Sequence, residues 1–354
     1  GNRSQESEFR DTGSVLEQPD GTDMLHYPAE NHLRNIRQLT FGGDNAEAYW
    51  SFDDQYLVFQ ATNQDWNVAC DQIFLLDIEK FDIRNQMPPR ISTGLGRTTC
   101  AYFLPDGNIL YASTHLSGYE CPPVPDQRED GKYVWPIYES FDIFLAGQDG
   151  EIISQLTDTP GYDAEATVSP CGDKIVFTSM RTGDLELFTM NIDGSDVQQV
   201  THSLGYDGGA FFSPDGTMLV YRASRPETEE DIRIYKELLS EGLVMPTKME
   251  IFLCNVDGSG VQQVTKLGKA NWSPFFHPSG EKIIFSSNHA GNRGFQFNLY
   301  MVDLDGSNLE RISHDHVFDA FPVFSNDGRY LVFSSNRNNG GTNETNLFIS
   351  EWVE

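Results

Sequence analysis

Residues 212–221 read Phe-Ser-Pro-Asp-Gly-Thr-Met-Leu-Val-Tyr, and this phrase decides the fold because variants of it return along the whole chain. Each copy has an aromatic or apolar residue, a turn similar to Ser-Pro-Asp-Gly, and a short apolar run that ends in Phe or Tyr. Asp and Gly tolerate the positive φ that tight turns require, so each copy predicts a β-hairpin. The six copies begin at Trp50, Phe103, Val168, Phe212, Phe276 and Phe324.

A third and a fourth strand are expected after each hairpin. The third is represented by Leu185–Met190, which is followed by an Asp-Gly turn at Asp193-Gly194. The fourth is expected at Val197–Thr201, Val261–Thr265 and Leu309–Ser313. Four short antiparallel strands, repeated about every 45 residues, predict an all-β fold, a six-bladed β-propeller.

The last repeat lacks a fourth strand because the sequence ends at Glu354. The missing strand is expected at Asn35–Thr40, which has the same Gln-Leu-Thr ending as the other fourth strands. We therefore expect the N-terminal strand to complete the last blade, which also removes exposed sheet edges. The predicted propeller covers residues 31–354, and the polar, acidic residues 1–30 are expected to be a disordered tail.

Two insertions interrupt the repeats, and both connect a second strand to a third. The blade-two insertion, Leu116–Tyr138, is rich in proline. The blade-four insertion, Pro226–Lys248, is predicted to contain a helix that starts after Thr228 and stops near Gly242. Because both follow second strands, they should rise from one face and wall a pocket around the mouth of the central channel.

Charge and hydropathy exclude some classes of partner. There are 53 acidic and 24 basic residues, which give a net charge of -29. That charge opposes binding to nucleic acid or to an anionic membrane surface. No apolar run approaches the roughly 18 residues that a transmembrane helix needs. The opening Gly1–Ser4 is compatible with an export signal that has been removed.

The repeated phrase resembles the PD40 repeats of TolB-like propellers, and the resemblance covers about residues 33–353. The segments Thr114–Leu116, Cys121–Trp135 and Asn271–Pro278 are similar to a subgroup of exported bacterial PD40 proteins. This implies a periplasmic or secreted protein, with lipid anchoring through a removed N-terminal segment as one form. Prolyl-oligopeptidase-type enzymes share such propellers, but their catalytic residues lie on a hydrolase domain with a G-x-S-x-G elbow, which this sequence lacks.

Polar residues recur where the chain enters each innermost strand, six residues before the second residue of the phrase. We call them the first ring: Asn45, Thr98, Asp163, Asp207, Asn271 and Asp319. A second ring lies two residues further on, on the same side of a regular strand: Glu47, Cys100, Glu165, Gly209, Ser273 and Phe321. The first ring, together with Glu47 and Glu165 of the second, is predicted to bind the ligand at the channel mouth.

Crowded carboxylates repel, so such a ring raises a pKa or attracts positive charge. Asp163, Asp207 and Asp319 are therefore candidate ligands for Ca²⁺ or another divalent cation. The alternative is a water-filled polar channel without a resident cofactor. Basic side chains are expected at the same end: Arg97, Arg181, Arg222, Arg225, Arg337 and His115. They could recognise a peptide with free termini or an anionic saccharide, or they could form salt bridges with the acids and hold the loops.

Cys70 and Cys121 fall in equivalent loops of neighbouring blades, and a disulfide between them is the favoured pairing. A metal site made by these two cysteines with Cys100 and His115 is the alternative. Cys171 and Cys254 are expected to be separate and reduced.

The favoured function is a non-enzymatic binding or scaffold protein of the cell envelope, which recognises a peptide, a protein segment or a small polar ligand at the channel mouth. One alternative is a metal-assisted hydrolase or lyase acting on carbohydrate, as the resemblance to oligogalacturonate lyases implies. Asp163, Glu165, Asp207 and Asp319 would then be metal ligands or general bases. The other alternative is an accessory propeller that gates a peptidase partner.

Overall fold

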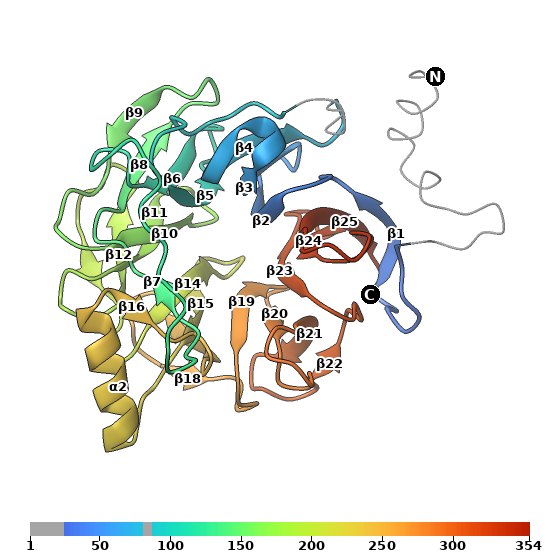
Figure 1. The fold of residues 1–354 in the computed structure, drawn as a ribbon. Helices are drawn as coiled ribbons and strands as arrows, with labels where there is room; N and C mark the ends of the chain where they lie inside the picture. Colours follow the sequence, from blue (N-terminus) through green and yellow to red (C-terminus); the bar gives the residue numbers. More distant parts are fainter. Residues whose placement is uncertain (1–24, 81–86) are drawn as a thin grey trace.

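The computed structural model describes residues 25–80 and 87–354, and its strands form six blades around a central axis (Figure 1). Each blade is an antiparallel sheet with its first strand at the axis. The blades follow one another around the ring in chain order. The predicted six-bladed β-propeller is therefore confirmed.

The blades are built from the following strands. Blade 1 contains β2 (Asp44–Trp50), β3 (Tyr56–Asn63) and β4 (Val68–Asp77), with a 3₁₀ turn, η1 (Gln64–Trp66), between the last two. Blade 2 contains β5 (Thr98–Phe103), β6 (Ile109–Ser113), β8 (Asp142–Ala146) and β9 (Ile152–Gln155). Blade 3 contains β10 (Asp163–Val168), β11 (Lys174–Ser179), β12 (Glu186–Asn191) and β13 (Gln198–Gln199).

The second half of the ring repeats this pattern. Blade 4 contains β14 (Asp207–Phe212), β15 (Met218–Ala223), β17 (Glu250–Asn255) and β18 (Gln262–Gln263). Blade 5 contains β19 (Asn271–Phe276), β20 (Lys282–Ser287), β21 (Asn298–Asp303) and β22 (Glu310–Arg311). Blade 6 contains β23 (Asp319–Phe324), β24 (Tyr330–Ser335), β25 (Asn346–Trp352) and β1 (Leu33–Gln38).

In the four copies that have serine at the second position, the serine side chain supports the hairpin. Ser213 Oγ donates a hydrogen bond to Asp215 Oδ1 at 2.6 Å and accepts one from the Met218 backbone N–H at 3.0 Å. The Phe or Tyr that ends each apolar run is fully buried in the core between blades, namely Phe59, Tyr111, Phe177, Tyr221, Phe285 and Phe333. The turn and the aromatic residue of the phrase therefore have separate structural roles.

The N-terminal strand closes the ring, as the sequence predicted. β1 pairs antiparallel with β25, and Leu33 lies opposite Trp352. The packed chain begins earlier than the predicted boundary at residue 31, because Leu25 belongs to the core and Glu30 is fully buried beside Arg337. The rest of the expected tail, residues 1–24, lies outside the described residues.

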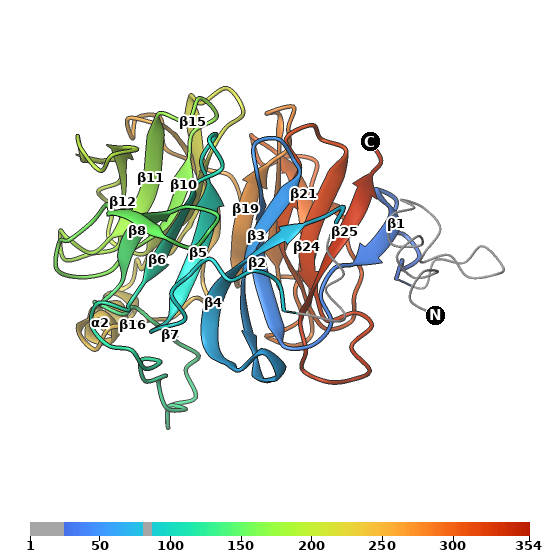
Figure 2. The same ribbon diagram turned by 90° about the horizontal axis from the view of Figure 1, so that it is seen from above.

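Both insertions lie at one end of the strands, where Figure 2 shows α2 (Glu229–Ser240), β7 (Trp135–Pro136) and β16 (Leu243–Val244) together. The helix matches the predicted one: Thr228 Oγ1 caps it by accepting from the Asp231 backbone N–H, and Tyr235 and Leu238 are buried. The structure adds a contact that the sequence did not indicate, since β7 of one insertion pairs with β16 of the other. Within the described residues, no helix is long and apolar enough to cross a membrane.

Candidate functional site: a blind pocket at the channel mouth

A β-bulge interrupts every innermost strand at its second-ring residue. The pairing of β10 with β11 shifts register between Ala164 and Thr167, and the other five innermost strands shift at the equivalent place. All six second-ring residues have a left-handed backbone, with φ between 52° and 63°, although only Gly209 is a glycine. All six line one cavity at the channel mouth. A bulge re-aims a side chain, so we attribute this placement to the repeated bulge.

Five of the six first-ring residues, all but Thr98, lie outside the cavity lining, which corrects the prediction. All six side chains are fully buried. Each acid forms an ion pair with the arginine 18 residues further along the chain, just after the second strand of the same blade. The pairs are Asp163 with Arg181 at 3.0 Å, Asp207 with Arg225, and Asp319 with Arg337 at 3.1 Å. The predicted mouth arginines Arg181, Arg225 and Arg337 thus neutralise first-ring carboxylates, as the salt-bridge alternative proposed.

The first ring also fastens each blade to the one before it. Asn271 Nδ2 donates to Glu250 Oε2 at 3.1 Å, and Asp319 Oδ2 accepts from Asn298 Nδ2 at 3.0 Å. Thr98 Oγ1 donates to the Asp71 carbonyl at 2.9 Å, and Asn45 Nδ2 donates to Asn346 Oδ1 at 3.2 Å. These contacts hold the ring together, and the first-ring residues other than Thr98 lie outside the cavity lining.

The three proposed metal ligands therefore do not converge, because Asp163, Asp207 and Asp319 lie in different blades and each is paired with its own arginine. Across residues 25–80 and 87–354, no group of three or more His, Cys, Asp or Glu side chains is placed to hold a metal ion.

The cavity at the mouth has a volume of about 860 Å³, and we call it the mouth pocket. Its floor is aromatic. The ring of Tyr49 lies 5.5 Å from that of Phe211, which lies 5.1 Å from Phe275, and Tyr102 packs beside the same two residues, Tyr49 and Phe211. These rings meet across the axis, so the mouth pocket is blind. A ligand that enters from the mouth would stop at this floor.

One wall of the mouth pocket comes from the blade-two insertion, which contributes Tyr133 and Trp135–Tyr138. Trp135 packs on Trp272 with ring centroids 4.9 Å apart, and Trp272 stacks on Phe297 at 4.3 Å. Trp272 Nε1 donates to the Pro246 carbonyl at 2.9 Å, so the blade-four insertion braces this wall from behind. The result is a continuous aromatic side of the pocket.

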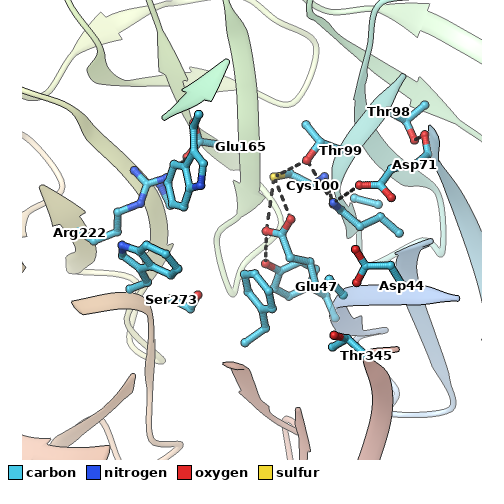
Figure 3. A pocket seen from close by; sticks show the side chains of 18 of the residues that line it. Asp44, Glu47, Asp71, Thr98, Thr99, Cys100, Glu165, Arg222, Ser273 and Thr345 are labelled. Atoms are coloured by element: carbon cyan, nitrogen blue, oxygen red, sulfur yellow. Dashed lines mark hydrogen bonds and ion pairs between the residues drawn. The ribbon is translucent and has the colours of Figure 1, made fainter. Parts of the chain in front are cut away.

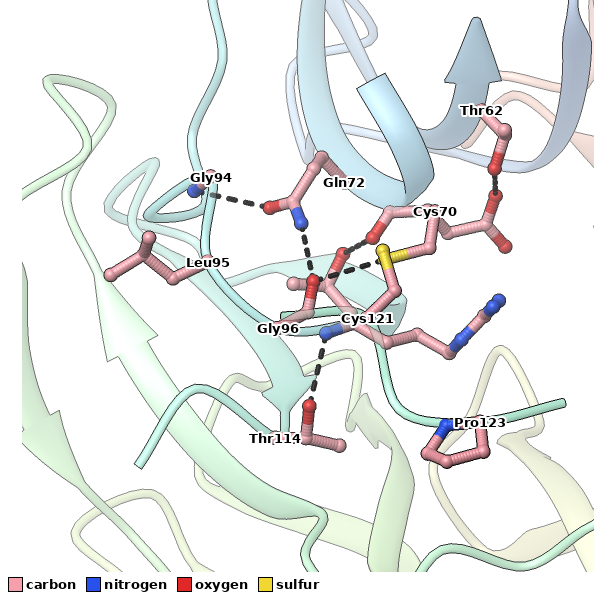
Figure 4. The surroundings of a disulfide bond; sticks show 12 residues. Thr62, Cys70, Gln72, Gly94, Leu95, Gly96, Thr114, Cys121 and Pro123 are labelled. Atoms are coloured by element: carbon pink, nitrogen blue, oxygen red, sulfur yellow. Dashed lines mark hydrogen bonds between the residues drawn. A yellow bond between two sulfur atoms is a disulfide. The ribbon is translucent and has the colours of Figure 1, made fainter. Parts of the chain in front are cut away.

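A disulfide anchors the blade-two insertion. Cys70 of β4 is bonded to Cys121, the pairing that the sequence favoured (Figure 4). The alternative metal site of Cys70, Cys121, Cys100 and His115 is wrong, because two of its sulfur atoms are bonded to each other. His115 instead lies outside the pocket lining, where Nδ1 is 2.8 Å from Ser113 Oγ and the ring packs on Phe144.

The second ring contains two glutamates with different surroundings (Figure 3). Glu165 is fully partnered: Oε1 accepts from Arg222 at 2.9 Å and from the Gly209 backbone N–H at 3.0 Å. Its Oε2 accepts from Tyr162 at 2.9 Å and from Tyr206 at 2.6 Å. Arg222 is 7% exposed, and its guanidinium lies 4.2 Å from the Tyr206 ring centroid. Glu165 and Arg222 are thus a neutral, rigid part of the wall.

Glu47 holds the equivalent position in blade 1 but has weak partners. Tyr49 Oη lies 3.2 Å from its carboxylate, and Cys100 Sγ lies 3.5 Å away. Among the described residues, no basic side chain forms an ion pair with it. Burial, with the nearby charges of Glu165 and Asp71, raises the pKa of Glu47 to about 7, although the two hydrogen bonds act in the opposite direction. Burial also raises the pKa of the Cys100 thiol well above its usual value.

The structure divides the predicted site residues into two groups. Those that line the mouth pocket are Glu47, Glu165, Thr98, Arg97 and Arg222. Those that lie outside it are Asn45, Asp163, Asp207, Asn271, Asp319, Arg181, Arg225, Arg337 and His115. The sequence-based prediction missed other lining residues, of which Asp44, Asp71, Trp272 and Phe318 are examples. Asp71 follows Cys70, so its position next to the predicted disulfide was the available signal.

Six blades, five of four strands and blade 1 of three among the described residues, surround a blind pocket and define a β-propeller with a cavity at one mouth of its channel. The family model of the TolB β-propeller domain, PD40, matches residues 138–244 and 243–344, more than half of the chain. The chain therefore belongs to the PD40 family of TolB β-propeller domains.

Solved structures show the same fold at low sequence identity. A putative TolB from Agrobacterium tumefaciens is 20% identical over 88% of this chain and 91% of its own, with a TM-score of 0.56. TolB from Acinetobacter baumannii is 16% identical over 88% of this chain and 64% of its own (TM-score 0.51). An oligogalacturonate lyase from Vibrio parahaemolyticus is 11% identical over 88% and 79% (TM-score 0.52). No curated protein matches the chain.

Proposed function

We propose that this protein is a binding protein of the bacterial cell envelope, and that its mouth pocket takes a peptide segment of a partner protein. The observation that carries the proposal is the blind pocket walled by the blade-two insertion, which the blade-four insertion braces. A concave, mostly pre-formed cavity with aromatic walls and a few polar groups is the usual form of a ligand site. Because the floor is aromatic and closed, the pocket suits a loop or a chain end that enters and stops there. It does not suit an extended peptide that would pass through the channel.

The wall of the pocket is rigid, which favours binding. The insertion is held by the Cys70–Cys121 disulfide, by the pairing of β7 with β16 and by the packing of Trp135 on Trp272. A pre-organised wall loses little conformational entropy when a ligand binds. Buried aromatic side chains are also the residues that most often dominate the energy of a protein interface.

The disulfide and the charge support the location and the class of partner. Disulfides persist in oxidising compartments such as the periplasm or the cell exterior. The net charge of -29 disfavours nucleic acid. An anionic saccharide is also disfavoured, because Arg181, Arg225 and Arg337 are occupied by ion pairs in the first ring. The donor set that the lyase or hydrolase alternative requires is not assembled among the described residues.

Filling the pocket tests the proposal. Gly209 has φ 63°, close to the 52° of Phe321 at the equivalent position, and a Cβ there would meet Arg222 at an ordinary 3.8 Å. A side chain at this left-handed position adds some backbone strain, but Phe321 shows that the same bulge accepts a phenylalanine, so Gly209→Phe should fold and occupy the pocket. Peptides selected from a random library on the wild-type protein should bind this variant at least about tenfold more weakly, a loss of about 1.4 kcal/mol.

The matched control is Ser273→Ala, which shortens another second-ring side chain without filling the pocket. The selected peptides should bind this variant almost as tightly as wild type in calorimetry. If Gly209→Phe retains full affinity while its melting temperature is unchanged, the mouth pocket is not where peptides bind and the proposal fails.

A further inference from the structure

Some carboxylates of the mouth pocket have a positively charged partner and others do not. Four carboxylates line it, Asp44, Glu47, Asp71 and Glu165, against two arginines, Arg97 and Arg222. Arg222 is committed to Glu165 at 2.9 Å. Asp71 accepts from Thr62 Oγ1 at 2.7 Å and from Gln60 Nε2 at 2.9 Å. Burial raises the pKa of Asp71, and these two hydrogen bonds and the nearby positive charge of Arg97 oppose that rise. Glu47 deep in the pocket and Asp44 at its exposed rim are left without a cation.

We propose that the group entering this pocket is an organic cation, a primary ammonium or a guanidinium, which binds Glu47 while its hydrocarbon part packs against Trp135 and Trp272. The inference rests on the proposed function, because it names the chemistry that the same pocket would select from a peptide. Figure 3 shows Glu47 between the aromatic wall around Arg222 and the acidic side formed by Asp44 and Asp71. A lysine or arginine side chain, or an amino terminus beside an apolar residue, has both of the required parts.

The comparison of the two ring glutamates supports a cation at Glu47. At Glu165, the same side chain on the same bulge receives an arginine, two tyrosine hydroxyls and a backbone N–H. At Glu47, the two contacts come from a tyrosine hydroxyl and a thiol, and a thiol is a weak donor. A carboxylate in a pocket with so little compensation gains most from a ligand that brings positive charge.

An anionic ligand would meet Glu47 and Asp44. Arg222 Nη2 is already paired with Glu165, and although Arg222 Nη1 and Arg97 Nε have no hydrogen-bond partner among the described residues, four carboxylates against two arginines leave the lining negative. A neutral ligand would leave the unfavourable environment of Glu47 in place. The charge of the whole chain acts in the same direction, since a net charge of -29 attracts cations toward an acidic pocket.

Binding of a cation should release a proton. Tyr49, Cys100, Glu165 and Asp71 are the titratable groups that face Glu47, and the pKa of Glu47 near 7 leaves it about half protonated at neutral pH. A nearby cation favours the ionised carboxylate. Each cation bound at pH 7 should therefore release up to about half a proton from Glu47.

The test uses four small probes of similar shape: 2-phenylethylamine, 2-phenylethylguanidine, the neutral 2-phenylethanol and the anionic 3-phenylpropionate. Calorimetry on the whole protein at low salt should give at least about tenfold tighter binding for the cations than for the alcohol or the acid. The two cations separate ammonium from guanidinium recognition, and tighter binding of either one supports the proposal. The proposal would be overturned if the alcohol or the acid bound as tightly as the cations or more tightly, or if neither cation showed saturable binding.

Two variants locate the site. Glu47→Gln should lose the preference for cations and also the proton release, measured by repeating the titration in two buffers of different ionisation enthalpy. Glu281→Gln removes the same charge at an exposed hairpin turn outside the pocket lining, and it should change neither result. Proton release that persists in Glu47→Gln would assign the cation to another group and refute the inference.

This outcome is separable from that of the proposed function. If selected peptides bind the wild-type protein but not Gly209→Phe, and the wild-type protein shows no preference for cationic probes, the proposed peptide pocket stands and the proposed cation recognition fails. A cation preference that depends on Glu47, together with peptides indifferent to Gly209→Phe, would do the reverse.

Discussion

The first and second rings lie two residues apart on the same six strands, yet most of their members differ in burial and in the groups they contact. First-ring side chains are fully buried and bonded to neighbouring strands and arginines. Second-ring side chains follow the same backbone into the mouth pocket and vary from Gly209 to Phe321. The bulge at the second ring separates a position that fastens neighbouring blades from one that lines the pocket, so residues at the second position can differ while the blades stay fastened.

Loss of charge should therefore lower the free energy of unfolding by different amounts in the two rings, and the largest loss is expected in the first. Arg337 is 1% exposed at its side chain and pairs with both Asp319 and Glu30. Arg337→Met keeps most of the volume but leaves two buried carboxylates without a cation, which should cost about 3–5 kcal/mol. Urea unfolding would measure the loss. Arg34→Met, which removes an exposed partner of Glu351 in the same blade, should leave the unfolding midpoint almost unchanged.

A smaller effect is expected at the second-ring glutamate that behaves as a structural residue. Glu165→Gln keeps the shape but removes the charge that compensates the buried Arg222, and we expect a loss of about 2 kcal/mol. Glu47→Gln is the matched substitution in blade 1 and should not destabilise the protein, because no cation depends on it. Equal losses of stability in the two variants would contradict the difference between these positions.

The smallest effect is a dependence of stability on pH. Because the pKa of Glu47 rises from 4.5 to about 7 on folding, the folded state holds this proton more tightly than the unfolded state. Its contribution to stability is therefore fully present below about pH 4.5 and is lost as the pH rises to about 7. The shift sets an upper limit of about 3 kcal/mol, and partial exposure to water lowers the expected loss to about 1 kcal/mol. Melting curves should show that Glu47→Gln removes this decline between pH 4.5 and 7; an identical decline in both proteins would exclude Glu47 as its source.

The sequence was sufficient to predict the propeller, because the residues of the repeated phrase contact one another or the adjacent core. Ser213 and Asp215 make the turn, and the aromatic residue that follows fills the core between blades. The Gln-Leu-Thr ending also identified the closing strand from residues more than 300 positions away from its partner. Local signals of this kind survive in a single sequence.

The roles of the two rings could not be read in the same way, because residues two apart face the same side only on a regular strand. Five of the six bulge residues are not glycine, so nothing in Glu47, Cys100 or Ser273 announces a left-handed backbone. Gly209 was the single hint, since a glycine within a strand often marks a bulge. The pairing of β7 with β16 was also out of reach, because it joins two-residue strands from insertions in different blades.

The pairing of β1 with β25 closes the ring, so that no blade is a terminal repeat. A linear array of repeats can fray from its last unit or gain another one, but here each blade has two neighbours and blade 6 exists only when both extremities of the described chain meet. Separating β1 from β25 would leave β25 paired with β24, but it would expose the outer edge of blade 6 and loosen its junction with blade 1. The molecule should accordingly lose its order as a whole, and the mouth pocket, assembled from all six innermost strands, is complete only while the circle is unbroken.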